Sequence, residues 1–134
     1  MTSAQHNRQF GESSNGVTVS SETDQQELLQ KSRASNRRLA RSHYENFLVT
    51  SFLLPQKLHQ PFYDIYAFCR VADDLADESS SKEQALAGLC EMERDLESVF
   101  SSCDGFMNPE RLLFIGLSDT IRRFGLDRQP FFDL

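Results

Sequence analysis

Apolar residues recur at helical spacing along most of the chain, and no segment has a convincing strand pattern. In the middle of the chain the apolar positions follow the three-and-four spacing of one helix face: Phe62, Ile65, Tyr66, Cys69, Ala72 and Ala76. Pro61 suits a first helical turn, so a helix is predicted from about residue 58 or 60 to Asp77. The fold class that follows is all-α.

One helix is predicted before this central helix and another after it. Thr23-x-x-Gln26 has the spelling of a capping box, which predicts a helix over residues 24–43. After Asp77 the serines end the central helix, and either Ser80 or Ser81 suits the cap of the next one. That next helix carries apolar residues at helical spacing: Leu86, Leu89, Met92, Leu96, Val99 and Phe100.

The last third of the chain holds a further helix and the beginning of another. Asn108-Pro109 is the pairing of a cap with a proline at the first helical position, and Gly125 suits the residue that follows a helix. A helix is therefore predicted from Pro109 to Phe124. Residues 128–134 look like the opening of a fifth helix. The bundle is thus predicted to have about four helices plus the start of a fifth.

The N-terminal segment differs in composition from everything that follows it. Residues 1–22 are rich in Ser, Asn, Gln, Thr and Gly and have almost no apolar periodicity, which is typical of a disordered polar tail. They also lack the apolar core of a secretory signal. Residues 23–134 are predicted to form the folded part as one domain.

Charge and cysteine content narrow the classes of partner. The 134 residues carry a net charge of −6, whereas nucleic-acid binders are more often basic, so no nucleic-acid partner is expected. The three cysteines have no C-x-x-C spacing, which argues against a zinc site or a disulfide framework and favours the reducing cytoplasm. No apolar run is long enough to cross a membrane. Peripheral association with a membrane surface stays open.

The candidate chemistry lies at the end of the central helix, in Asp73-Asp74-Leu75-Ala76-Asp77. On a helix, Asp73 and Asp77 project from one face a turn apart, and like charges at that spacing repel each other. Carboxylates are also unfavourable at a helix C-terminus. Hard oxygen ligands of this kind suit Mg²⁺. Arg70 lies on roughly the same face, where its guanidinium could grip a phosphate oxygen.

A plain structural interpretation stands beside the functional one. Acidic clusters are common on solvated helix ends, and Arg70 with Asp74 has the spacing of an ordinary i,i+4 ion pair. The many Phe residues, 11 in all, suit either an apolar pocket or ordinary core packing.

The short sequence segments around the acidic cluster resemble those of the squalene/phytoene synthase family, and the resemblance covers roughly residues 26–134. They are Ser42–Phe47 (SHYENF), Leu53–Pro55, Ile65–Arg70 (IYAFCR), Ala72–Glu78 (ADDLADE), Leu117–Phe124 and Gln129–Leu134. The HYENF spelling looks most like the bacterial hopanoid-pathway branch of hydroxysqualene synthases. Other members condense two farnesyl or two geranylgeranyl diphosphates head to head, as presqualene diphosphate or phytoene synthases.

The resemblance implies an all-α isoprenoid synthase bundle in which Mg²⁺ ions hold the diphosphate of a prenyl diphosphate substrate. Asp73, Asp74 and Asp77 match the first metal-binding motif, with Asp73 and Asp77 as its outer, catalytic aspartates. Arg70 matches a diphosphate-binding arginine, and Tyr66 a position lining the cavity, assigned here to catalysis. The remaining substrate-binding matches fall in the short polar stretch that touches the diphosphate: His43, Tyr44, Asn46 and Phe47. The match there is loose at Tyr44 and Asn46.

One expected element is missing from these residues. The family has a second D-x-x-x-D motif on a later helix, and no such pair follows Asp77. The chain is therefore interpreted as an N-terminal portion of a synthase, expected to be inactive alone and to expose apolar surface. The alternative is a non-catalytic helical module, for which an intact paralogous synthase would be a natural partner.

Overall fold

The computed structural model describes residues 21–42 and 52–134. Four long helices account for most of them: α1 (Glu22–Ser42), α3 (His59–Glu78), α4 (Lys82–Ser101) and α5 (Leu112–Phe124). A short 3₁₀ turn, η1 (Gln56–Leu58), leads into α3, and a four-residue helix, α6 (Gln129–Phe132), lies near the C-terminus. The described residues contain no strand. The all-α prediction is confirmed.

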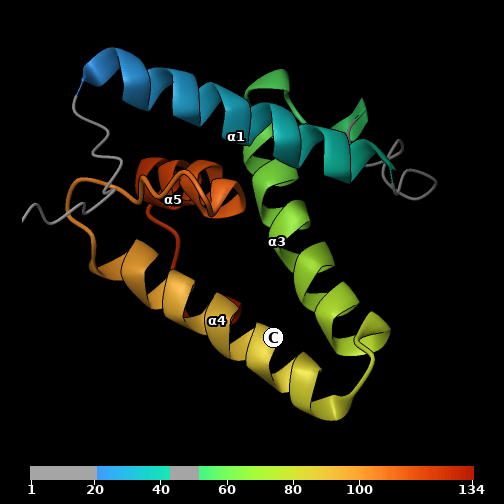
Figure 1. Ribbon diagram of the computed structural model, residues 1–134. Coiled ribbons are helices and arrows are strands. Elements are labelled where there is room, and N and C mark those ends of the chain that lie inside the picture. The colour runs from blue at the N-terminus through green and yellow to red at the C-terminus, as the bar shows by residue number, and fades with distance from the viewer. Residues whose placement is uncertain (1–20, 43–51) are drawn as a thin grey trace, which may run out of the picture.

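Helices α3 and α4 form a V (Figure 1) whose apex is the short connection between Glu78 and Lys82. Helix α1 lies across the open end of the V and packs on both α3 and α5. Helix α5 packs in turn on α3 and α4. The two arms of the V are therefore held apart at one end by α1 and α5, and meet at the other.

Several helix ends agree with the residues that predicted them. Ser81 caps α4, because its side-chain Oγ accepts a hydrogen bond of 3.2 Å from the backbone N–H of Gln84. Gly125 follows α5 with φ 59° and ψ 44°, the left-handed conformation that glycine adopts without steric cost. The backbone N–H of Leu126 then donates to the carbonyl of Ile121, closing the helix end.

One predicted helix cap and one predicted helix start were wrong. Helix α1 begins at Glu22, and Ser21 is its cap, since Ser21 Oγ accepts from the N–H of Asp24 at 3.1 Å. Helix α5 begins at Leu112 instead of Pro109. Asn108 makes a turn: its side-chain oxygen accepts from the N–H of Glu110, and its backbone carbonyl accepts from the N–H three residues on. The asparagine that predicted a helix cap therefore closes a turn that delays the helix.

The core lies between α3, α4 and α5 and is rich in aromatic side chains. The ring of Phe68 meets those of Phe114 and Phe131 edge-on, with centroids 6.3 and 5.7 Å apart. The buried members of this cluster are Phe68, Met92, Leu96, Val99, Phe106, Phe114, Ile115, Leu117 and Ile121. Phe residues therefore serve core packing to a large extent.

Two glycines allow helices to approach closely. A Cβ at Gly88 of α4 would lie 2.7 Å from Leu75 Cδ2, near the apex of the V. A Cβ at Gly116 of α5 would lie 2.8 Å from Asp64 Oδ1 and 2.9 Å from Ser32 Oγ. At Gly116 the added atom would collide with polar side chains of two other helices, so this contact depends on the absence of a side chain, whereas at Gly88 it would meet only the movable end of Leu75.

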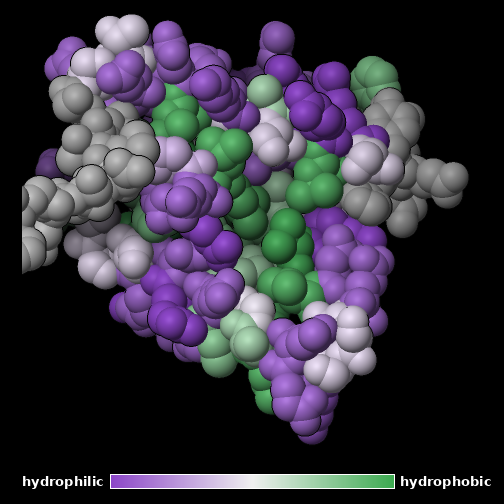
Figure 2. Space-filling view, viewed as in Figure 1, coloured by the Kyte–Doolittle hydropathy of each residue, from purple (hydrophilic) through white to green (hydrophobic). Residues whose placement is uncertain are grey.

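Helix α3 is buried on a different face from the one its apolar spacing predicts. Its fully buried residues are Pro61, Tyr63, Asp64, Ala67 and Phe68. The predicted apolar face, which includes Phe62 and Cys69, is only half-buried. Hydrophobic residues gather in the middle of one face of the molecule (Figure 2), with polar residues around them. No helix within the described ranges is long and apolar enough to cross a membrane.

Candidate active site

The predicted motif lies on the last two turns of α3, and its three aspartates differ in surroundings. Asp73 and Asp77 are exposed, whereas Asp74 is half-buried. Asp77 follows Asp73 by four residues, a rise of about 6 Å along the helix axis. The last turn of α3 contains no basic residue to offset these charges. Within the described residues, Asp73 and Asp77 have no ion-pair partner, and both face solvent at the electrostatically unfavourable end of the helix.

Arg70 is bound to the middle aspartate. Its Nη2 lies 2.9 Å from Asp74 Oδ1, and the two side chains are 32% and 33% exposed. The i,i+4 ion pair considered from the sequence is thus present. Arg70 Nε is buried and has no hydrogen-bond partner among the described residues. A buried donor without an acceptor costs about 1–3 kcal/mol, so this guanidinium is held at some expense beside the acidic face.

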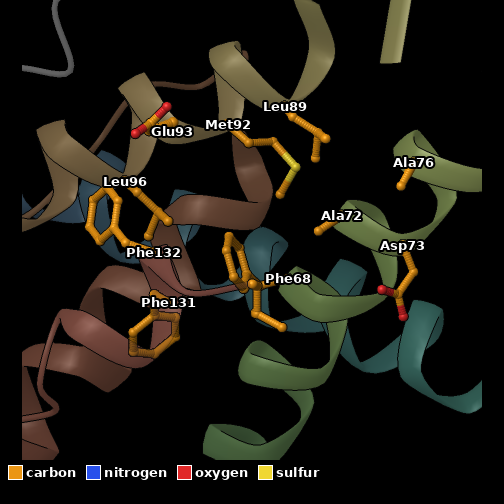
Figure 3. A pocket seen from close by; sticks show the side chains of 11 residues that line it. Phe68, Ala72, Asp73, Ala76, Leu89, Met92, Glu93, Leu96, Phe131 and Phe132 are labelled. Atoms are coloured by element: carbon orange, nitrogen blue, oxygen red, sulfur yellow. The ribbon is translucent and has the colours of Figure 1, made fainter. Parts of the chain in front are cut away.

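Asp73 lies at the edge of a cavity of about 250 Å³ between the arms of the V. Figure 3 shows Phe68 and Ala72 of α3 facing Met92 and Leu96 of α4 across this space, with Asp73 to one side. The full lining is Phe68, Ala72, Asp73, Ala76, Leu89, Met92, Glu93, Leu96, Phe131, Phe132 and Leu134. Nine of these eleven side chains are apolar, so an apolar group could occupy the space while a polar one met Asp73.

The sequence did not predict which residues near the C-terminus line the cavity. Phe131 and Phe132 of α6 cover the side of the cavity away from α3, and Phe100 lies 5.9 Å from Phe131 between ring centroids. Arg128 stacks over the ring of Phe132 at 4.7 Å and pairs with Glu97 at 2.7 Å, which fixes α6 on α4. The abundance of Phe was the one feature of the sequence that could have suggested this lining.

Tyr66 stands apart from the cavity. It is half-buried and packs with Phe62 against Ala40 and Tyr63, in a second small cluster between α3 and α1. The structure therefore does not bring Tyr66 to the apolar space beside Asp73. The other predicted substrate-binding residues, His43, Tyr44, Asn46 and Phe47, lie outside the described residues.

The donor set at the end of α3 fits Mg²⁺ better than a metal held by protein ligands alone. The described residues hold no group of three or more His, Cys, Asp or Glu side chains that could bind a metal ion. Mg²⁺ usually takes one or two carboxylates and completes its shell with water and substrate phosphates. Asp73 and Asp77 supply two such carboxylates. Next to them, burial raises the pKa of the Cys69 thiol, and the charge of Asp73 adds to the effect.

A family model described as squalene/phytoene synthase matches residues 40–134, and the chain belongs to this family. The match includes α3 with its acidic motif, α4, α5 and α6. The family resemblance predicted from the residues is thereby confirmed, and with it the partial isoprenoid synthase bundle.

Named relatives agree with this assignment. A 15-cis-phytoene synthase of Synechococcus elongatus is 32% identical over 98 residues, covering 73% of this chain and 30% of the relative. Phytoene synthase 1 of Zea mays is 29% identical over 96 residues, covering 72% and 22%. A presqualene diphosphate synthase of Rhodopseudomonas palustris is 29% identical over 86 residues, covering 64% and 29%. The matched part thus spans less than a third of these relatives, and no solved structure matches the chain.

Proposed function

We propose that α3 carries the first diphosphate-binding motif of a Mg²⁺-dependent synthase that joins two prenyl diphosphates head to head. The observation that supports this best is the placement of Asp73, which is exposed, lies one turn from Asp77 and borders an apolar cavity. A prenyl diphosphate has this division into a charged head and an apolar chain. The names of the relatives, phytoene synthases and a presqualene diphosphate synthase, favour condensation.

Each group at the site has a part in this proposal. Mg²⁺ neutralises a leaving diphosphate and so lets an allylic C–O bond ionise. Asp73 and Asp77 would hold the metal ions, and Asp74 would orient Arg70 so that its free nitrogens meet phosphate oxygens. The rings of Phe68 and Phe131 line a largely apolar space, and aromatic faces stabilise a nearby cation.

A second candidate is the conversion of presqualene diphosphate to hydroxysqualene. It is favoured by the HYENF spelling at residues 43–47, which resembles the hydroxysqualene branch of the family. The same aspartates would bind the same kind of head group, so the two candidates differ in the fate of the cation and share the site on α3.

The site itself is testable in the 134-residue chain by calorimetric titration with farnesyl diphosphate. Binding is expected with Mg²⁺ and lost when EDTA removes it. Asp73→Asn and Asp77→Asn should each weaken binding at least tenfold. Asp104→Asn, which changes an exposed acid in the α4–α5 loop, is the matched control. Equal affinity in all four proteins would refute the metal assignment.

The reaction is testable in a protein extended to the length of the relatives, supplied in turn with farnesyl, geranylgeranyl and presqualene diphosphate. Presqualene diphosphate or phytoene as product supports condensation, and hydroxysqualene supports the second candidate. In that protein Asp73→Ala or Asp77→Ala should reduce turnover at least 100-fold. The 134-residue chain is expected to give no product, since it offers one aspartate motif; turnover by it would contradict that expectation.

A further inference from the structure

A buried acid lies on the side of α3 opposite the candidate site. The carboxyl group of Asp64 is 1% exposed. Its Oδ1 accepts hydrogen bonds from Asn36 Nδ2 of α1 at 2.9 Å and from Gln60 Nε2 at 3.1 Å. Its Oδ2 accepts from Thr120 Oγ1 of α5 at 2.8 Å. One side chain of α3 thus links α3 to both α1 and α5.

The same junction joins α1 directly to α5. Ser32 Oγ of α1 accepts from the backbone N–H of Gly116 at 2.7 Å and donates to the carbonyl of Leu112. Asn36 Nδ2, besides bonding Asp64, donates to the carbonyl of Leu113 at 3.3 Å. Because Gly116 has no side chain, the three helices come close enough for all of these bonds to form.

The junction has a fixed angular relation to the acidic motif. At about 100° per residue, Asp73 lies nine residues and about 180° from Asp64, and Arg70 and Asp77 fall within roughly 60° of Asp73. A rotation of α3 about its axis would therefore move these side chains relative to α4 and the cavity. Hydrogen bonds on the back of the helix, to partners on two other helices, resist that rotation.

We propose that Asp64 is a positioning residue for the site: its hydrogen bonds to α1 and α5 fix the rotation of α3, and so aim Arg70, Asp73 and Asp77. The claim that this orientation of the site residues matters for catalysis rests on the proposed function. The fixing of α3 does not.

The network also tolerates loss of the carboxylate charge. The Thr120 hydroxyl donates to Asp64 Oδ2 but can equally accept, since a hydroxyl has both capacities. A protonated carboxyl, or an amide in its place, could donate to Thr120 while its other oxygen keeps the bonds from Asn36 and Gln60. Burial raises the pKa of Asp64, while the hydrogen bonds and the charge of Arg33 counter the shift. Shape and bonding capacity are therefore what the position requires.

The setting of α3 can be followed through Cys69, which is half-buried on the turn between Asp64 and the motif. In a Cys90→Ser, Cys103→Ser background it is the only thiol. The rate at which DTNB labels Cys69 under native conditions is measured. It is compared with the rate expected if labelling occurred only through global unfolding, as calculated from the unfolding free energy in urea. Asp64→Leu, which keeps the branched side-chain shape and removes every hydrogen bond of the carboxyl group, should speed labelling at least tenfold beyond that rate. Asp64→Asn should stay within twofold of the parent.

The control for simple destabilisation is Val99→Ala, which opens a cavity in α4 without touching the junction. The labelling rate of Cys69 in this variant should rise only as much as the variant's lower free energy of unfolding requires. If Asp64→Leu behaves in the same way, the proposal is overturned. If Asp64→Leu does not fold, Thr120→Val removes the bond to α5 alone and should still give a threefold excess, and no excess there overturns the proposal. Labelling needs neither Mg²⁺ nor diphosphate, so its outcome is independent of the proposed function.

Discussion

Helix α3 packs on α1 and α5 through a closed set of hydrogen bonds, and on α4 and α6 through aromatic side chains that leave a cavity. On the first side a charged residue is buried and satisfied by three donors. On the second side Asp73 and Asp77 are exposed and apolar residues line the open space. The comparison separates two demands on one helix: a specific fixed orientation, and a surface left available for a ligand.

The largest effect is expected on the aromatic side, from Phe68→Ala. Phe68 is 3% exposed and contacts rings on α5 and α6, so its removal should cost about 3–5 kcal/mol of unfolding free energy. Urea denaturation measures this. Phe132→Ala, at a half-buried ring on the far wall of the cavity, should cost less. Equal losses would mean that the cavity wall is packed as tightly as the core.

On the hydrogen-bonded side, Gly116→Ala should cost about 1–3 kcal/mol, because the new Cβ would collide with Asp64 and Ser32. Gly88→Ala is the matched control. Its Cβ meets only the flexible end of Leu75, and alanine favours a helix over glycine by up to about 1 kcal/mol. The control should therefore lie near the parent in urea denaturation. If Gly116→Ala did as well, the three helices would be less closely packed than described.

The pH dependence of stability should identify the burial of Asp64. Its pKa is higher in the folded than in the unfolded chain, so its favourable contribution is complete below about pH 4 and is lost as the pH rises through the folded pKa. The parent should therefore lose stability relative to Asp64→Asn over that interval. The charged side chains near the junction are Arg33 of α1 and Asp119 of α5, which form an ion pair at 2.6 Å. Arg123 Nη1 lies 3.8 Å from Asp119. Parallel stability curves for the two proteins would contradict the direction of the shift.

The smallest effect is expected at the exposed acids. Asp77→Asn removes a negative charge from the C-terminal turn of α3 and should stabilise the chain by about 0.3–1 kcal/mol. Thermal unfolding at low ionic strength measures the gain, and added salt should reduce it. Asp104→Asn, outside any helix, should show no comparable gain. A destabilised Asp77→Asn would mean that the acid has a structural role.

The sequence predicted the helices well where their signals are local. The serine cap of α4 and the glycine after Phe124 each act within a few residues; the glycine was found, and of the two candidate serines, Ser80 and Ser81, the cap is Ser81. The start of α5 was missed because two local signals compete at Asn108, where a turn and a helix cap use the same side chain. The acidic motif was placed on its helix correctly, since spacing alone decides which carboxylates share a face.

The junction at Asp64 could not be predicted in the same way. An acid within a run of aromatic residues is ordinarily assigned to solvent, and the partners that satisfy it lie 28 and 56 residues away. The cavity was equally out of reach, since its walls come from α3, α4 and α6. Both depend on how the helices pack on one another. The apolar periodicity of a single helix gives no information about that packing.

Gly88 gives the V a pivot. Gly88 of α4 lies against Leu75 of α3 near the apex, where a Cβ would come within 2.7 Å of Leu75 Cδ2, and the two arms diverge from the apex toward the cavity. Leu96 lies eight residues farther along α4, about 12 Å from the pivot. Over that distance a small change of crossing angle becomes a larger change in the gap between the arms. A side chain larger than alanine at position 88 would meet more than the movable end of Leu75 and change the crossing angle, so this glycine influences the width of the cavity between the arms.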